Sequence, residues 1–435
     1  MSKFLFSWGR YPKSPQQAHE LNWENEVSLV LQDLQQGCLA YGLGRSYGDS
    51  CLAASNHVIK LVGMDRILSV DWSTGVICAQ AGLSLADLIH ISMPHGWFPA
   101  VTPGTKFVTL GGAVANDVHG KNHHVKGTFG CHVRKIRLLR SDEGIVDCSP
   151  SVRSELFNAT IGGIGLTGVI LSVEIQLRAI NSSLINQRSI RFGGLEEFFD
   201  LAAHYDQNCE YTVAWIDCLA KNQSLGRGHF IVGDHAHIGT LQSNPDSKLV
   251  IPFELPFSLV NSLSLRLFNW LYYNRQQSKE RVNITSYSPF FYPLDGVRHW
   301  NRMYGNSGFQ QYQCVIPMSN ARDVIRQVMK EISLSDTGSF LAVLKQCGEI
   351  VSPGLLSFPM HGISLALDFP QRAEINERLF SKLDHLVHDA GGRLYPAKDA
   401  HMSQKHFKQG YSNWQILESF RDPQLLSQFW KRVTR

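Results

Sequence analysis

The sequence predicts a globular protein of mixed helix and strand, of the α/β or α+β class, divided near residue 185. Three observations lead to this prediction. Hydrophobic residues make up 43% of the 435 residues and charged residues 18%, a composition that excludes a disordered or fibrous chain. Strand and helix patterns alternate through residues 15–180 with glycine-rich connections. After residue 185 the strands become rich in aromatic residues and their connections lengthen.

The expected elements follow from the spacing of apolar residues. A period near 3.6 predicts helices, whereas β-branched or alternating runs predict strands. In the first part, we expect helices over 24–34 and 83–92 and strands over 39–41, 58–61, 133–140 and 168–177. In the second part, we expect strands over 211–217, 311–316 and 363–368 and helices over 320–332 and 373–389. Gly391 and Gly392 end the last of these helices.

Charge and cysteine content exclude some functions and compartments. The net charge of +4 over the whole chain provides no electrostatic basis for nucleic acid as a partner. Nine cysteines at irregular spacing, with no Cys-x-x-Cys pair, indicate reduced thiols in a reducing compartment. The N-terminal apolar run is too short for a signal peptide, and no stretch approaches the ~20 apolar residues that cross a bilayer. We therefore expect a cytoplasmic protein with at most a peripheral contact at the inner membrane.

The stretch 249–274 is unusually apolar and aromatic. It is interrupted by Pro252, Glu254, Pro256 and Arg266, which exclude a helix that spans a membrane. Two interpretations stay open. The stretch is either an interfacial segment that meets lipid or an ordinary helix packed on the core, and the second is the commoner use of such a pattern.

Glycine-rich loops are the main chemical signal. Residues 42–48, Gly-Leu-Gly-Arg-Ser-Tyr-Gly, directly follow a strand, and small residues with hydroxyls recur at 102–105 and 109–116. Glycines let backbone amides approach an anion, so the first loop is either a phosphate-binding loop or a plain tight turn. The loops together favour a large phosphorylated cofactor. Residues 163–168 match G-x-G-x-x-G, but a helix precedes and a strand follows, so we reject a Rossmann NAD site.

Two further clusters carry candidate chemistry. His119 and His123 are four residues apart, as in helical zinc sites, but Gly120 weakens a helix and no nearby residue completes a ligand set. We expect no metal there. Tyr395 and Lys398 follow the Gly-Gly stop. Such a lysine accepts a proton if burial lowers its pKa, although a surface lysine is the commoner case.

These motifs resemble those of the FAD-linked decaprenylphosphoryl-β-D-ribose 2-oxidase family. The matching segments, in order, are 42–49, 109–113, 117–124, 127–130, 214–218, 290–294, 311–313, 342–345 and 394–399. The resemblance covers nearly the whole chain. It implies an α+β fold of the vanillyl-alcohol-oxidase type, with a two-part FAD-binding domain at 1–185 and 393–435. An antiparallel-sheet substrate domain would occupy 186–392.

The resemblance also implies an activity. The enzyme would oxidise the carbon-2 hydroxyl of a polyprenylphosphoryl-β-D-ribose to the 2-keto sugar, the first half of an epimerisation to arabinose in cell wall polysaccharide biosynthesis. A separate NADH-dependent keto-reductase would complete it. FAD would be bound non-covalently, because the first loop lacks the histidine that many related oxidases link to flavin. The alternatives are an aldonolactone or sugar-alcohol oxidase of the same superfamily and a non-catalytic flavin-binding scaffold subunit.

Site residues follow from the resemblance, position by position. The catalytic residues would be Lys398, Tyr47 and Gln313. The flavin would contact Gly42, Leu43, Gly44, Arg45, Ser46, Tyr47, Gly48, Pro103, Gly104, Thr105, Val108, Thr109, Gly111, Gly112, Ala113, Asn116, His119, Gly165, Val169 and Tyr395. The sugar and its phosphate would meet Lys121, Trp215, Gln311, Gln313, Lys345 and Lys398. Mycobacterial members carry a cysteine where this chain has Ala366, so chemistry that depends on that thiol is not expected here.

Overall fold

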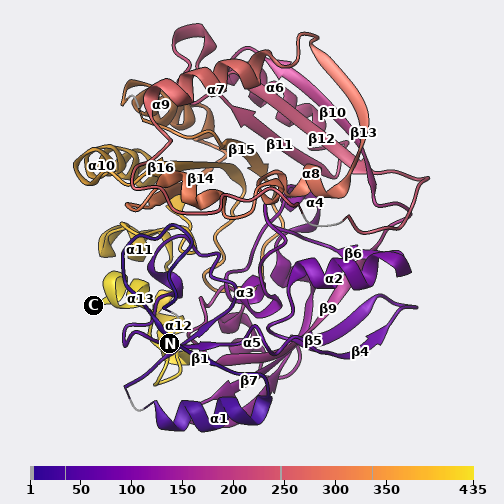
Figure 1. The fold of residues 1–435 in the computed structure, drawn as a ribbon, viewed down its shortest axis with the longest axis vertical. Helices are drawn as coiled ribbons and strands as arrows, with labels where there is room; N and C mark the ends of the chain where they lie inside the picture. The colour runs from indigo at the N-terminus through magenta and orange to yellow at the C-terminus, as the bar shows by residue number, and fades with distance from the viewer. Residues whose placement is uncertain (1–3, 35, 245–246, 336) are drawn as a thin grey trace.

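A computed structural model describes residues 4–34, 36–244, 247–335 and 337–435. Within these residues the strands form three sheets (Figure 1). The smallest is parallel, in the order β1 (Gln17–Glu20), β3 (His57–Lys60), β2 (Leu39–Tyr41). The second is antiparallel and consists of β4 (Ile67–Asp71), β5 (Val76–Gln80), β9 (Val169–Ala179), β7 (Val133–Arg140) and β8 (Gly144–Cys148), with β6 (Trp97–Pro99) paired to β9.

The third sheet is antiparallel throughout. Its order is β13 (Glu280–Ser286), β10 (Leu184–Phe192), β12 (Gly228–His235), β11 (Tyr211–Ile216), β15 (Ala342–Cys347), β16 (Gly362–Pro370), β14 (Phe309–Pro317) and β17 (Arg393–Leu394). Mixed helices and largely antiparallel sheets place the protein in the α+β class, and the α/β alternative is not realised.

Helices cover the sheets. Those of the first part are α1 (Glu24–Asp33), α2 (Leu85–Ser92), α3 (Leu110–Ala115), α4 (His123–Lys126) and α5 (Ser154–Thr160). Those of the middle are α6 (Leu195–Tyr205), α7 (Ser262–Asn274), α8 (Tyr287–Phe291), α9 (Ala321–Leu334) and α10 (Ala373–Asp389). The C-terminal ones are α11 (Gln404–Gly410), α12 (Trp414–Phe420) and α13 (Gln428–Thr434). In α9, Ile325, Val328, Met329 and Ile332 recur at helical spacing and are fully buried against the eight-stranded sheet.

The C-terminal residues return to the start of the chain. Cys38 bridges to Leu425, and Ala53 bridges to Ser427. The Arg432 guanidinium donates to both Asp49 and Asp399 at 2.8 Å, which ties the first glycine loop to the segment around Lys398. These two ion pairs and the two bridges bring residues from the two ends of the sequence together.

The expected elements are confirmed. Each predicted helix and strand is present, and its ends lie within two residues of the prediction. The segment 249–274 differs from the core interpretation, because most of its apolar side chains are exposed and only Leu265 and Asn269 of α7 are buried. Among the described residues, no helix combines the length and apolar character needed to cross a membrane.

Candidate active site

A cavity of about 790 Å³ lies between the glycine loops and the eight-stranded sheet. Its walls come from the loops after β2 and β6, from α3, from strands β11, β14, β15 and β16, and from residues 395–398. It brings together most of the residues predicted from the sequence. These are Gly42, Leu43, Gly44, Arg45, Ser46, Tyr47, Pro103, Gly104, Thr105, Val108, Thr109, Gly111, Gly112, Asn116, His119, Lys121, Gly165, Trp215, Gln311, Gln313, Lys345, Tyr395 and Lys398.

Three predicted flavin contacts do not line this cavity. Gly48 packs against the backbone of Asp399, Ala113 is fully buried within α3, and Val169 is fully buried at the start of β9. Each is adjacent in sequence to a lining residue, but its own atoms face another part of the core. These three positions lie behind the cavity wall, and their contact with flavin stays a prediction.

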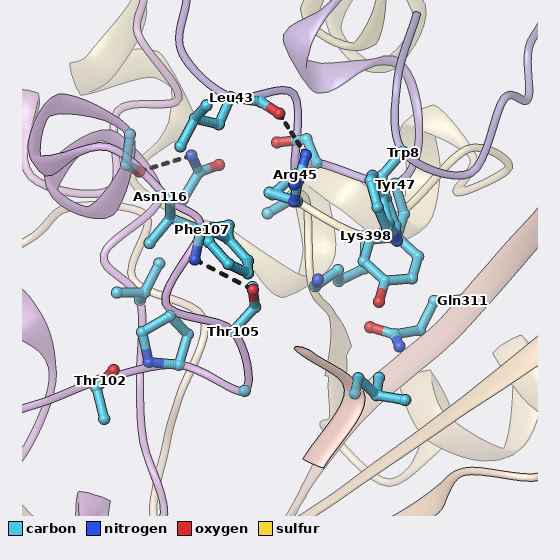
Figure 2. Close-up of a pocket in the computed structure, with 18 of the residues that line it drawn as sticks. Trp8, Leu43, Arg45, Tyr47, Thr102, Thr105, Phe107, Asn116, Gln311 and Lys398 are labelled. Atoms are coloured by element: carbon cyan, nitrogen blue, oxygen red, sulfur yellow. Dashed lines mark hydrogen bonds between the residues drawn. The ribbon is translucent and has the colours of Figure 1, made fainter. Parts of the chain in front are cut away.

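The first glycine loop presents backbone donors to the cavity. Within the described chain, the amides of residues 42–46 donate to no backbone or side-chain acceptor. Gly44 has a φ of 62°, a left-handed conformation that favours glycine. Arg45 donates to the Leu43 carbonyl at 2.7 Å, and its guanidinium lies 4.1 Å from the centroid of the Trp8 ring (Figure 2). Unpaired amides beside a half-buried guanidinium suit a phosphate-bearing ligand.

The loops at 102–105 and 163–168 leave room for a bulky ligand. A Cβ added at Gly104 of the first, or at Gly165 of the second, would meet no atom within 4 Å. Thr105 donates its hydroxyl to Asp295 at 2.7 Å, and the Lys106 amide donates to the other oxygen of the same carboxylate at 2.9 Å. These two hydrogen bonds attach the loop at 102–105 to Asp295, a residue of the second part of the chain. The open space and the unpaired amides fit FAD.

His119 lies on the cavity wall, and one of its two ring nitrogens is hydrogen-bonded within the protein. Gln313 donates its amide to His119 Nε2 at 3.2 Å, which leaves Nδ1 buried and, among the described residues, without a partner. Burial lowers the pKa of His119 well below its usual value, so the ring is neutral and Nδ1 carries a proton. Because this Nδ1 has no partner, His119 can donate to an oxygen of a bound group.

Tyr395, on the same wall, donates its hydroxyl to the Asn116 carbonyl at 2.8 Å.

Lys398 lies at the centre of the site and is not the surface lysine that the alternative interpretation expected. Its Nζ is 3.7 Å from the centroid of the Tyr47 ring, and Figure 2 shows it with Tyr47 and Gln311. Burial lowers the pKa of Lys398 to about 7, although the Asp368 carboxylate opposes this change. A lysine with such a pKa is a neutral base over part of the physiological range.

Asp368 is a site residue that the sequence did not reveal. It is buried on β16, directly opposite Gln311 of β14, and accepts from Gln311 Nε2 at 2.6 Å. Burial raises the pKa of Asp368 to about 7. An aspartate within the apolar run Ile363-Ser-Leu-Ala-Leu-Asp368 was the available signal, because a carboxylate rarely enters a buried strand without a partner. Sequence reasoning also missed many other lining residues, among them Trp8, Phe107, Tyr272, Asp295 and Trp300.

Lys345, which is buried, and Lys121, which is half-buried, place two amines in the same cavity. Lys345 donates to the Gly120 carbonyl at 2.7 Å, and Lys121 donates to the Phe291 carbonyl at 3.0 Å. Burial lowers the pKa of Lys345 to about 8 and that of Lys121 to about 7. No carboxylate neutralises either amine within ion-pair distance in the described part of the chain, so an anionic ligand would stabilise their charged forms.

Comparisons with known proteins agree with this geometry. A model of the FAD-binding domain matches residues 23–149. The chain is 35% identical to decaprenylphosphoryl-β-D-ribose oxidase of Mycolicibacterium smegmatis, over 94% of this chain and 92% of that protein. It is 31% identical to an uncharacterised protein of Streptomyces coelicolor, over 78% of this chain and 94% of that one. L-gulonolactone oxidase of Mus musculus is 28% identical over only 39% of each chain.

Proposed function

This chain belongs to the decaprenylphosphoryl-β-D-ribose oxidase family and is an FAD-dependent oxidoreductase, and from this premise we propose its substrate and reaction. The substrate is a polyprenylphosphoryl-β-D-ribose, whose carbon-2 hydroxyl is oxidised to a ketone. The observation that carries the proposal is the pair of lysine amines, Lys121 and Lys345, in the same cavity as Lys398. A phosphate-linked sugar supplies the anion that they need, whereas a free aldonolactone or sugar alcohol does not.

The chain's own residues would handle the proton and the orientation of the sugar. Neutral Lys398 accepts the proton of the carbon-2 hydroxyl, and the ring of Tyr47 stabilises the resulting ammonium. When bound, FAD supplies an acceptor for the hydride that leaves carbon 2. Gln313 donates a hydrogen bond to His119 and so orients its ring, and Gln311 is oriented by its hydrogen bond to Asp368. The two glutamines and the histidine would thus be polar partners for the reacting sugar.

The finer domain organisation is also a proposal. We assign residues 1–185 and 393–435 to a two-part FAD-binding domain of the vanillyl-alcohol-oxidase type, and residues 186–392 to the substrate domain. The bridges from Cys38 to Leu425 and from Ala53 to Ser427 support a shared first domain. The continuous antiparallel sheet from β10 to β16 supports a separate second one.

The place of the reaction follows from the chemistry of its product. A 2-keto sugar must be reduced on the opposite face to give the arabino epimer, so we propose a separate NADH-dependent keto-reductase as the partner. Cell wall polysaccharide biosynthesis would consume that epimer. Because the substrate is attached to a polyprenyl chain, we also propose a cytoplasmic enzyme in peripheral contact with the inner membrane.

FAD is proposed to bind non-covalently. The loop after β2 holds Arg45 and Ser46, with no histidine from residue 42 to residue 48 to form a bond to the flavin. Acid denaturation of the yellow protein is therefore expected to release all of the FAD into the supernatant. Flavin absorbance that stays with the precipitated protein would contradict this proposal.

Asp368→Asn is expected to shift the pH dependence of flavin reduction. The Asp368 carboxylate raises the pKa of Lys398, so its removal lowers that pKa further. Flavin reduction needs neutral Lys398, so the rate in the wild type rises with pH through about 7. The acid limb should move down by about 1 pH unit in the variant, as measured by stopped-flow absorbance. An acid limb that stays in place or moves up would show that Asp368 does not act on Lys398.

Product analysis tests the proposed reaction. The enzyme is incubated with polyprenylphosphoryl ribose, and the product is reduced with sodium borodeuteride and hydrolysed. Oxidation at carbon 2 predicts ribose and arabinose that carry deuterium at carbon 2. Deuterium at another carbon, or no deuterium incorporation beyond a control without enzyme, would overturn the proposal.

A further inference from the structure

Helix α7 turns its large apolar side chains away from the protein. Leu263, Leu267, Trp270 and Leu271 have 53–76% of their surface exposed. Their spacing places them on one side of the helix, which we call the α7 face. The helix lies at the opposite end of the molecule's long axis from α1 (Figure 1). A group of four exposed large apolar side chains on one helix is uncommon on a soluble surface and indicates a binding role.

The orientation of α7 is fixed by polar contacts on its inner side. Asn269 is buried and donates to the Asp217 carboxylate at 2.8 Å, and Asp217 is ion-paired with Arg227 at 3.0 Å. At the N-terminus, Asn261 Oδ1 accepts from the amides of Leu263 and Ser264 at 3.1 Å. The helix cannot rotate to bury its apolar face without breaking the buried amide–carboxylate bond. The α7 face is thus built to point outward.

The segment before α7 is equally apolar and is held in place by its backbone. Phe253 and Phe257 are each more than 60% exposed. The guanidinium of Arg302 donates to the carbonyls of Ile251 and Pro252 at 2.7 Å. The Arg298 amide donates to the Leu249 carbonyl at 2.8 Å. These bonds present the aromatic side chains on an ordered segment.

Arginines border this surface. Arg275 is exposed at the C-terminal end of α7, and Arg298 is exposed beside the preceding segment. Glu254 is the one acidic residue between 249 and 275, and it forms an ion pair with Arg10. An apolar face bordered by arginines is complementary to a bilayer that contains anionic phospholipids.

The same surface borders the cavity. Tyr272 and Arg275, at the C-terminal end of α7, line it, as do Arg298 and His299. Three of these four residues, the two arginines and the histidine, are also exposed to solvent, so the cavity opens beside them. A second copy of the chain seated on this surface would cover that opening, whereas a bilayer would present a lipid-borne ligand to it.

We propose that the α7 face docks on an anionic phospholipid bilayer and thereby brings the cavity opening to the membrane surface. The inference rests on the proposed function for its purpose, the capture of a lipid-borne substrate. The docking itself is a separate property of the surface and is measured without turnover.

The test compares two triple variants of the FAD-loaded protein in vesicle co-sedimentation. One carries Leu263→Gln, Leu267→Gln and Trp270→Gln, and the matched control carries Leu68→Gln, Val152→Gln and Val351→Gln at exposed apolar positions elsewhere. Vesicles contain phosphatidylcholine with either 30% phosphatidylglycerol or none. The wild type and the control are expected to bind the anionic vesicles. The affinity of the α7 variant for these vesicles should be lower by a factor of about ten or more. Vesicles without phosphatidylglycerol should bind all three proteins weakly.

Lack of wild-type binding to anionic vesicles, or equal loss in both variants, would overturn the inference. A wild-type dimer that becomes monomeric in the α7 variant, with no vesicle binding by either, would assign the face to a second copy instead. If the triple variant does not fold, the quenching of tryptophan fluorescence by brominated lipid tests the docking instead. Trp270→Phe should then lose a large part of the quenching seen in the wild type, and unchanged quenching would contradict docking. Failure of the proposed reaction would appear in the borodeuteride experiment and not in vesicle binding, which involves no turnover.

Discussion

Lys398→Ala is expected to lower the rate of flavin reduction by substrate by a factor of about 100 to 10,000, the usual contribution of a general base. Lys398 is the cavity amine that lies against Tyr47, and burial lowers its pKa to about 7, so it can accept the hydroxyl proton as the ketone forms. Its side chain makes no hydrogen bond or ion pair within the described chain, so its loss should leave the fold and the bound FAD intact. Anaerobic stopped-flow absorbance measures the rate, and the flavin spectrum reports the bound FAD.

Two further variants separate base catalysis from a general loss of charge. Lys398→Arg should not restore the rate, because a guanidinium stays protonated and cannot accept the proton. Lys405→Ala, at an exposed lysine of the same C-terminal segment, should reduce flavin at the wild-type rate. Near-normal flavin reduction by Lys398→Ala would show that another group in the cavity takes the proton.

Gly104→Ile is expected to weaken FAD binding by a factor of about 10 to 100. A Cβ at position 104 meets no protein atom, and the residue lines the cavity, so a larger side chain occupies the space assigned to the cofactor without disturbing the fold. Forcing extra methyl groups into an occupied site costs about 1 to 3 kcal/mol, which corresponds to this loss of affinity. Titration of the apoprotein with FAD, followed by flavin fluorescence, measures the dissociation constant.

Gly193→Ile is the matched control. Gly193 is exposed and outside the cavity, its φ lies outside the left-handed region, and the nearest atom to an added Cβ is the flexible Glu197 carboxylate at 3.8 Å. This variant should bind FAD as the wild type does. An unchanged affinity in Gly104→Ile would show that the cofactor does not occupy the space in front of this loop.

Local sequence pattern predicts much of this fold, because the positions of apolar residues decide which segments become helices and strands. For the strand at 133–140 and the helix at 373–389, the predicted first and last residues are those of the structure. Closely spaced glycines in the sequence also predict the loops that line the cavity, such as residues 42–47. Sheet order was not predictable in this way, since it depends on pairings between distant strands.

The residues that sequence reasoning missed are those that long-range pairing brings to the site. Asp368 acquires its role only because β16 aligns it with Gln311, and Asp295 because it reaches the loop at Thr105 from a distant part of the chain. The orientation of α7 was equally hidden. Its pattern identifies an apolar face, but the buried contact between Asn269 and Asp217 decides that this face points outward.

Anaerobic reduction of the bound flavin tests the central claim most directly. The FAD-loaded enzyme is mixed without oxygen with polyprenylphosphoryl-β-D-ribose, free ribose or L-gulonolactone, and absorbance near 450 nm is followed. We expect rapid and complete bleaching by the phosphate-linked sugar. Reduction by the two neutral compounds should be at least about a hundredfold slower, because they lack the anion that Lys121 and Lys345 would bind. Equal or faster bleaching by L-gulonolactone, or no bleaching by the phosphate-linked sugar, would contradict it.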